Sequence, residues 1–250
     1  NLILKEGPET VAAFFAEPVM GAGGVIIPPK SYFPKVQKVL EKYDILLVAD
    51  EVICGFGRTG NMWGSETFTI RPDIVTAAKA LSSAYLPISA VIISEKVYGP
   101  IKDQANELGI FGHGYTYSAH PVCAAVAMKA QQIMIDRNII DNVKQLSKLF
   151  NERIQNIKNN SWFLSHSRSV GLIGAVEFGY EGNKKFDIKS KIAAKCAKII
   201  QENGVILRAL PGDIIGFCPP LIIKEEQINE MFDKIDIAFK SFDEMAFNLK

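Results

Sequence analysis

Short apolar runs alternate with segments of helical period through the first part of the chain. Runs of strand length stand at residues 12–15, 45–49, 73–76 and 88–94, and apolar positions at helical spacing separate the first two. This alternation is typical of α/β proteins, in which crossover helices connect parallel strands. The sequence therefore predicts an α/β fold with a mostly parallel sheet. Because residues 88–94 are nearly all apolar, we expect that strand to be covered on both faces.

A polar cluster at residues 159–161 ends a helical pattern that begins after Asp141, a possible cap. We place a domain boundary there, with residues 1–158 in a larger domain and 159–250 in a smaller α+β domain. An earlier helix is expected from residue 121 to about residue 134. The smaller domain is predicted to contain a strand over 171–178, a helix over 187–203, strands over 205–209 and 213–217, and a long terminal helix.

Charge and cysteine content exclude several classes of protein. Lys and Arg number 28 against 27 Asp and Glu, so a net charge of +1 provides no field to attract nucleic acid or an anionic membrane. The sequence has no apolar run long enough to span a bilayer, and its start lacks the pattern of a signal peptide. The four cysteines form no CxxC pair, which favours reduced thiols and a cytoplasmic location. We predict no metal site.

The segment Gly55–Gly60 matches the G-x-G-x-x-G pattern of a dinucleotide-binding turn. Its surroundings do not fit that function. Five residues separate the preceding strand from Gly55, and residues 61–72 show no amphipathic helix whose N-terminus could hold a pyrophosphate. A nicotinamide-dependent oxidoreductase is therefore disfavoured, and titration with NAD or NADP would test it.

Two charged residues follow predicted strands, where open α/β sheets bind their ligands. Asp50 comes after five apolar residues, so its carboxylate should need a cationic partner or several hydrogen-bond donors. A capped loop carboxylate is the alternative. Lys79 lies among the small residues of segment 76–80. A surface lysine is the usual case, but a close-packed turn would desolvate the amine, lower its pKa and make it a nucleophile.

Together these residues belong to a series of motifs in a recognisable order, and the series resembles the class III, or omega, aminotransferases that use pyridoxal phosphate. The motifs span nearly the whole chain: AEPVMGAGGVI at 16–26, LVADEVICGFGRTG at 47–60, PDIVTAAKAL at 72–81, HGYTYSAHP at 113–121, GD at 212–213 and PPLI at 219–222. The resemblance implies the pyridoxal-phosphate-dependent transferase fold of type I. It also implies that the chain corresponds to the C-terminal half, or slightly more, of such an enzyme, because the family's N-terminal phosphate loop has no counterpart here.

The resemblance assigns roles to five residues at the cofactor. Lys79 would bind pyridoxal phosphate covalently and then move a proton at the substrate carbon. Asp50 would pair with the ring nitrogen, Val52 would pack on one ring face, and Glu17 would also line the cofactor site. Thr116 would bind the phosphate of a neighbouring subunit, which implies a homodimer with shared active sites. Ordinary core packing remains the alternative for Val52, and a turn residue the alternative for Thr116.

Two further residues are implied at the substrate. Arg208 occupies a position similar to the family's mobile arginine, whose planar donors suit a carboxylate, although a surface arginine is the alternative. Ala22 stands where members acting on ornithine or 4-aminobutyrate with 2-oxoglutarate carry a glutamate. The sequence therefore resembles the members that transfer an amino group from a primary amine or omega-amino acid to a keto acid, with pyruvate expected. A mutase or decarboxylase of the same fold, and a non-catalytic truncated scaffold, remain alternatives.

Overall fold

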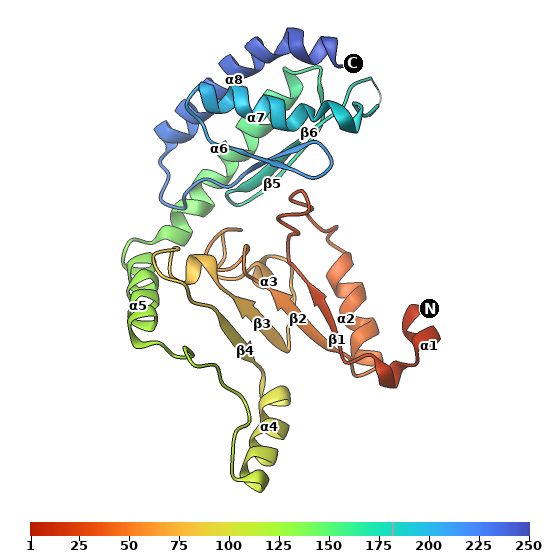
Figure 1. Cartoon of the computed structure of the whole chain (residues 1–250), viewed down its shortest axis with the longest axis vertical. Helices are drawn as coiled ribbons and strands as arrows, with labels where there is room; N and C mark the ends of the chain where they lie inside the picture. Colours follow the sequence, from red (N-terminus) through yellow and green to blue (C-terminus); the bar gives the residue numbers. More distant parts are fainter. Residues whose placement is uncertain (182) are drawn as a thin grey trace. The chain divides into compact units, whose positions relative to one another are not determined.

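A computed structural model describes residues 1–181 and 183–250, and these divide into two compact units (Figure 1). The first unit holds most of the chain up to residue 138 and the second most of the remainder. Two short early segments, 19–27 and 57–60, also belong to the second unit. The chain therefore passes between the units several times before residue 139.

The first unit is built on a four-stranded sheet in the order β1-β2-β3-β4. Its strands are β1 (Ala13–Ala16), β2 (Leu46–Asp50), β3 (Ile74–Ala77) and β4 (Ala90–Ile93), of which the first three are parallel and β4 is antiparallel to β3. Helix α2 (Tyr32–Lys42) connects β1 to β2 and buries Phe33 and Leu40 in a core with Leu47. The prediction of a mostly parallel α/β sheet is confirmed.

The prediction that residues 88–94 form a strand covered on both faces is wrong. Strand β4 lies at an edge of the sheet, and its residues Val91, Ile92 and Ile93 are exposed. An apolar run indicates that a segment is shielded from water, but it does not indicate whether residues of the same chain shield it.

The remaining elements of the first unit are mostly short. They are α1 (Leu2–Glu6), η1 (Pro8–Thr10), α3 (Gly64–Thr67), η2 (Lys79–Leu81), α4 (Glu95–Leu108) and α5 (Pro121–Asp136). Between α4 and α5 runs an extended arm, residues 109–120, in which every residue is exposed (Figure 1).

The second unit is an antiparallel sheet in the order β5-β6-β8-β7, packed with three long helices. Its elements are α6 (Ile139–Asn159), β5 (Leu164–Val170), β6 (Ile173–Phe178), η3 (Ile188–Ser190), α7 (Ile192–Glu202), β7 (Arg208–Leu210), β8 (Ile214–Phe217) and α8 (Glu225–Asn248). Six phenylalanines lie fully buried at its centre, at positions 150, 163, 178, 217, 232 and 242. The predicted α+β character is confirmed, but β5 was not predicted because its sequence, LSHSRSV, is largely polar.

The predicted boundary between residues 158 and 159 is wrong, because the second unit resumes at Ile139. Helix α6 belongs to this unit: its apolar face, which includes Val143, Phe150 and Ile154, is part of the core formed by β5, β6 and α8. The polar cluster at 159–161 ends a helix and not a domain. None of the described helices combines the length and apolar character needed to cross a membrane.

Candidate active site

The carboxyl ends of β1, β2 and β3 meet at one edge of the first unit's sheet, because the three strands are parallel. Asp50 is the last residue of β2, pairs in register with Thr76 of β3, and is half-buried. Its Oδ1 accepts a hydrogen bond from the Val52 amide at 3.0 Å and another from the Thr76 hydroxyl at 3.2 Å. The donors predicted for this carboxylate are present, and they fix its orientation at the sheet edge.

Glu51 is a second carboxylate at this strand end, and the sequence suggested no particular role for it. Its side chain is fully buried and accepts hydrogen bonds from the Gly64 amide at 2.9 Å, the Ser65 amide at 2.6 Å and the Ser65 hydroxyl at 2.5 Å. Burial raises the pKa of Glu51, while the bonds from Ser65 and Gly64 act in the opposite direction. An acidic residue directly after a buried strand was the available signal. Glu51 ties the loop after β2 to α3.

Gly64 leaves no room for a side chain at this junction. A Cβ there would lie 2.6 Å from Cys54 Cβ, 2.8 Å from Pro18 Cβ and 3.1 Å from Glu51 Oε2. Pro18 follows β1, whereas Glu51 and Cys54 follow β2. The loops after two parallel strands and the start of α3 therefore meet at a single glycine.

Lys79 opens the short helix η2, two residues after the end of β3. Its backbone is left-handed, with φ of 44°, a conformation that costs energy in any residue with a side chain. The Gln131 amide group of α5 donates to the Ala80 and Leu81 carbonyls at 3.1 and 2.9 Å and so holds η2 in place. The expected close-packed lysine is not found: Lys79 is exposed in this chain. Among its small neighbours, Ala77 is buried and Ala78 and Ala80 are half-buried, whereas Lys79 itself is exposed.

The other residues implied at the cofactor divide between this edge and the arm. Glu17 follows the end of β1, Val52 follows β2, and both are half-buried. Thr116 instead lies in the exposed arm, and no hydrogen bond or ion pair recorded in the described part of the chain joins it to Asp50 or Lys79. The structure thus brings Glu17, Asp50, Val52 and Lys79 to one sheet edge and leaves Thr116 apart.

Both residues implied at the substrate belong to the second unit. Ala22 is exposed within a turn formed by residues 21–24, and Arg208 is the exposed first residue of β7. Each is accessible to a ligand.

Arg58 of the glycine-rich segment forms hydrogen bonds to other residues of the chain. Within the second unit, Arg58 Nη1 donates to the carbonyls of Leu172 at 2.8 Å and Pro219 at 2.6 Å, and the Arg58 carbonyl accepts from the Leu172 amide at 3.0 Å. The first helix after Gly60 is α3, which has only four residues. The geometry therefore gives no support to a dinucleotide-binding turn.

Comparison with known proteins defines the class of protein to which this chain belongs. A sequence profile for the family described as aminotransferase class-III matches residues 1–239, so the chain belongs to that family. Its fold is that of pyridoxal-phosphate-dependent transferases of type I, with mixed α/β content.

Individual relatives are named transaminases. The chain is 46% identical to a probable gamma-aminobutyrate transaminase 2, mitochondrial, of Oryza sativa subsp. indica, over 100% of this chain and 50% of the relative. It is 48% identical to gamma aminobutyrate transaminase 3, chloroplastic, of Solanum lycopersicum, over 100% of this chain and 48% of the relative. The chain therefore spans about half the length of the curated relatives it matches.

Solved structures agree on the fold. A structure described as a transaminase with L-Ala superposes with a TM-score of 0.93 at 45% identity, over 98% of this chain and 57% of that one. The omega transaminase from Pseudomonas jessenii in complex with PMP gives a TM-score of 0.94 at 42% identity, over 98% of this chain and 54% of that one. Class III aminotransferases use pyridoxal phosphate, of which PMP is the aminated form.

The residues at the sheet edge fit this cofactor. An oriented, half-buried carboxylate at Asp50 suits a protonated ring nitrogen, and the accessible amine of Lys79 suits a covalent link to an aldehyde. Val52, placed beside Asp50, adds an apolar side chain that can pack on the ring. The family's cofactor and the donor set of this chain therefore agree.

Proposed function

We propose that the complete protein containing this chain is a pyridoxal-phosphate-dependent aminotransferase that moves an amino group from an omega-amino acid or primary amine to a keto acid, with pyruvate as the acceptor. The observation that carries the proposal is the pair Asp50 and Lys79 at the carboxyl ends of adjacent parallel strands, with the carboxylate held by Val52 and Thr76.

The two residues would divide the chemistry. When bound, pyridoxal phosphate supplies an electron sink that stabilises negative charge on the substrate carbon. The Asp50 carboxylate holds the proton on the ring nitrogen, because a fixed negative charge favours the protonated form. The Lys79 amine would take a proton from the substrate carbon as a general base and would then, as a general acid, deliver it to the carbon of the cofactor that carries the aldehyde. The left-handed backbone at Lys79, at the start of η2, fixes the point from which the side chain and its amine extend.

Three observations support the choice of substrates. Curated relatives at 46–48% identity are named gamma-aminobutyrate transaminases, and a solved relative is described with L-Ala, the amine into which pyruvate is converted. Ala22 offers no carboxylate to neutralise Arg208, which leaves the guanidinium free for the carboxylate of a substrate. We therefore expect 4-aminobutyrate and pyruvate to form a productive pair.

A homodimer is part of the proposal. Every residue of the arm 109–120 is exposed, and the arm carries Thr116 together with apolar side chains such as Phe111 and Tyr117. Exposed apolar surface of this kind marks a contact surface. The arm is suited to present Thr116 to the cofactor phosphate of a neighbouring subunit.

The proposal is tested by incubating the complete protein with pyridoxal phosphate, 4-aminobutyrate and pyruvate and measuring L-alanine. Wild type should form alanine and show the visible absorbance of bound cofactor. Lys79→Ala should lose that absorbance and about 10²-fold or more of the activity, as expected for loss of a general acid and base. Lys96→Ala is the matched control, because Lys96 is an exposed lysine of the same unit that pairs with Asp44. Cofactor binding without alanine formation would favour a mutase or decarboxylase, and absence of both would favour a scaffold.

A further inference from the structure

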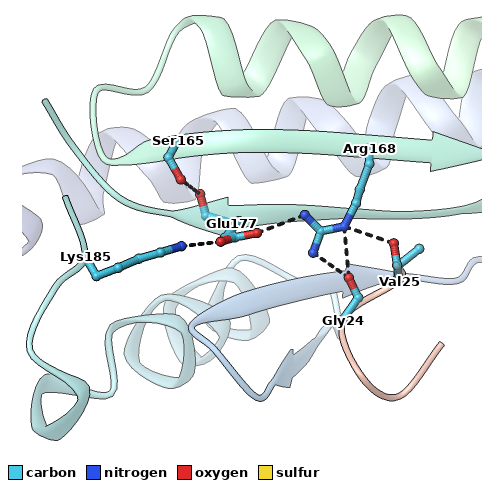
Figure 2. A network of polar contacts seen from close by, with 6 residues as sticks. All are labelled: Gly24, Val25, Ser165, Arg168, Glu177 and Lys185. Atoms are coloured by element: carbon cyan, nitrogen blue, oxygen red, sulfur yellow. Dashed lines mark hydrogen bonds and ion pairs between the residues drawn. The ribbon is translucent and has the colours of Figure 1, made fainter. Parts of the chain in front are cut away.

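Arg168 of β5 holds the turn that carries Ala22. Its Nε donates to the carbonyl oxygens of Gly24 at 3.0 Å and Val25 at 2.9 Å, and its Nη2 donates to the Gly24 oxygen at 2.6 Å (Figure 2). Within the turn, the Gly21 carbonyl accepts from the amides of Gly24 and Val25 at 3.1 and 3.0 Å. The guanidinium therefore fixes two consecutive carbonyls of a tightly closed loop.

The guanidinium is itself held by the sheet. Its Nη1 donates to Glu177 Oε2 of β6 at 2.9 Å, and Glu177 Oε1 accepts from Lys185 (Figure 2). The side chains of Arg168 and Glu177 are 21% and 19% exposed, so water screens their attraction only in part. Burial acts to raise the pKa of Glu177, but hydrogen bonds from Lys185 and Arg168 outweigh it and hold the pKa below its ordinary value. The carboxylate is therefore ionised at neutral pH and orients the arginine.

Strand β8 packs on the turn from another side. Gly24 has φ of 120°, and a Cβ there would lie 2.7 Å from Ile214 Cδ1. Ile214 pairs in register with Leu210 of β7, the strand that begins with Arg208. A single sheet thus carries the arginine that binds the turn, the isoleucine that packs on it, and the arginine implied at the substrate carboxylate.

We propose that Arg168 is a positioning residue, which fixes the turn of Ala22 relative to Arg208 and so sets the width of the subsite for the substrate carboxylate. This inference rests on the proposed function, because it assigns the carboxylate subsite to these residues. A planar guanidinium can bind two carbonyls and a carboxylate at once, whereas a lysine ammonium cannot reproduce that fork. Arginine is required here for its shape as well as its charge.

The test uses Arg168→Lys in the complete, pyridoxal-phosphate-loaded protein with two donors that differ only in a carboxylate, 4-aminobutyrate and n-butylamine. The first half-reaction is followed by the change in cofactor absorbance, so that no keto acid contributes. We expect kcat/KM for 4-aminobutyrate to fall about 10-fold or more through KM, because a small misplacement of a binding group is costly. The value for n-butylamine should change less than about 2-fold.

Arg153→Lys is the matched control. Arg153 is exposed to a similar extent, 19%, and also binds a carboxylate, Asp233 at 2.6 Å, but its side chain contacts residues of α8. This variant should leave the ratio between the two donors unchanged. Gly24→Ala displaces the turn from the Ile214 side and should reproduce the selective effect of Arg168→Lys. If Arg168→Lys lowers the amount of folded protein, Gly24→Ala tests the inference in its place.

Amide hydrogen exchange over residues 20–27 gives a readout independent of activity. Exchange should accelerate in Arg168→Lys and remain as in wild type in Arg153→Lys. Equal losses for both donors in Arg168→Lys, or unchanged exchange over 20–27, would overturn the inference. If wild type itself forms no alanine, the proposed function fails, whereas faster exchange in Arg168→Lys would still support the hold of Arg168 on the turn.

Discussion

The two units of the chain differ in how completely each covers its own sheet. In the second unit, three helices and an antiparallel sheet enclose six fully buried phenylalanines. In the first unit, Phe15 of β1 is 70% exposed, Val91 of β4 is 68% exposed, and the arm 109–120 is exposed throughout. The candidate cofactor residues belong to the less covered unit. The second unit thus covers its own sheet, whereas the candidate cofactor residues of the first unit lie beside surfaces that this chain leaves exposed.

The sharpest test of this contrast is Phe150→Ala against Phe15→Ala. Phe150 is fully buried in the second unit, so its truncation should cost about 3–5 kcal/mol of unfolding free energy. Phe15 is mostly exposed, and its truncation should change stability by less than about 0.5 kcal/mol. Urea unfolding of this chain checks both, with Trp162 reporting on the second unit and Trp63 on the first. Equal losses would remove the distinction between the units.

Asp50→Asn tests the chemistry of the first unit without removing its packing. The amide oxygen can still accept from Val52 and Thr76, but the charge proposed to hold the ring proton is lost. In the complete protein, alanine formation should fall roughly 10²–10³-fold, the usual effect of losing one electrostatic stabiliser.

Asp73→Asn provides the control for that substitution. Asp73 also accepts a backbone bond, from the Leu47 amide at 2.9 Å, but it precedes β3 and so lies at the opposite edge of the sheet. We expect its activity to stay within about 2-fold of wild type. A comparable loss in both variants would mean that Asp50 acts only through the fold.

Glu51→Ala tests whether the loop after β2 depends on its buried carboxylate. The substitution leaves the Gly64 and Ser65 amides without their partner, which should cost about 1–3 kcal/mol of unfolding free energy. Because the pKa of Glu51 is raised, ionisation opposes folding, and the wild-type contribution should decline as pH rises through that pKa. Glu66→Ala removes an exposed acceptor of the Trp63 amide and should cost about 1 kcal/mol or less. Urea unfolding at several pH values measures both.

The smallest effect is expected at Glu177 of the second unit. Its pKa lies below the ordinary value, so its stabilisation is present above the unfolded pKa, about 4.3, and is lost as pH falls through the folded pKa. Glu177→Gln should therefore destabilise by less than about 1 kcal/mol at pH 7 and by almost nothing near pH 3. A gap between wild type and variant that is independent of pH would contradict this assignment.

Sequence patterns predicted the elements whose burial is decided locally. Helix α6 and helix α8 carry long apolar faces, and strands β1 to β3 are short apolar runs, so their existence followed from periodicity. Strand β5 was not predicted because its side chains are largely polar, although its backbone pairs with that of β6. The unit boundary was missed because α6 packs on β5, a contact that no local pattern reports.

The candidate site was predictable for a different reason. Asp50 could be singled out because a carboxylate after a buried strand needs donors, and the register with β3 supplies Thr76. Lys79 does follow the end of a strand, as predicted, but its left-handed backbone and its exposure are not predicted by its small neighbours. Arg168 acts through a contact distant in sequence, with Gly24, so its role could not be inferred from spacing. Glu51 was marked by its place directly after a buried strand, but its partner Ser65 was not predictable.

The crowding around Gly64 has a consequence for how this protein can change over evolution. A single added methyl group would have to push aside Pro18, Cys54 or Glu51. Pro18 is next to Glu17 in the sequence, and Glu51 is next to Asp50. Displacing Pro18 or Glu51 would therefore also displace one of these two proposed cofactor contacts. Substitutions of Gly64 should thus rank among the least tolerated in a saturation mutagenesis library, even though glycine itself takes no part in the reaction.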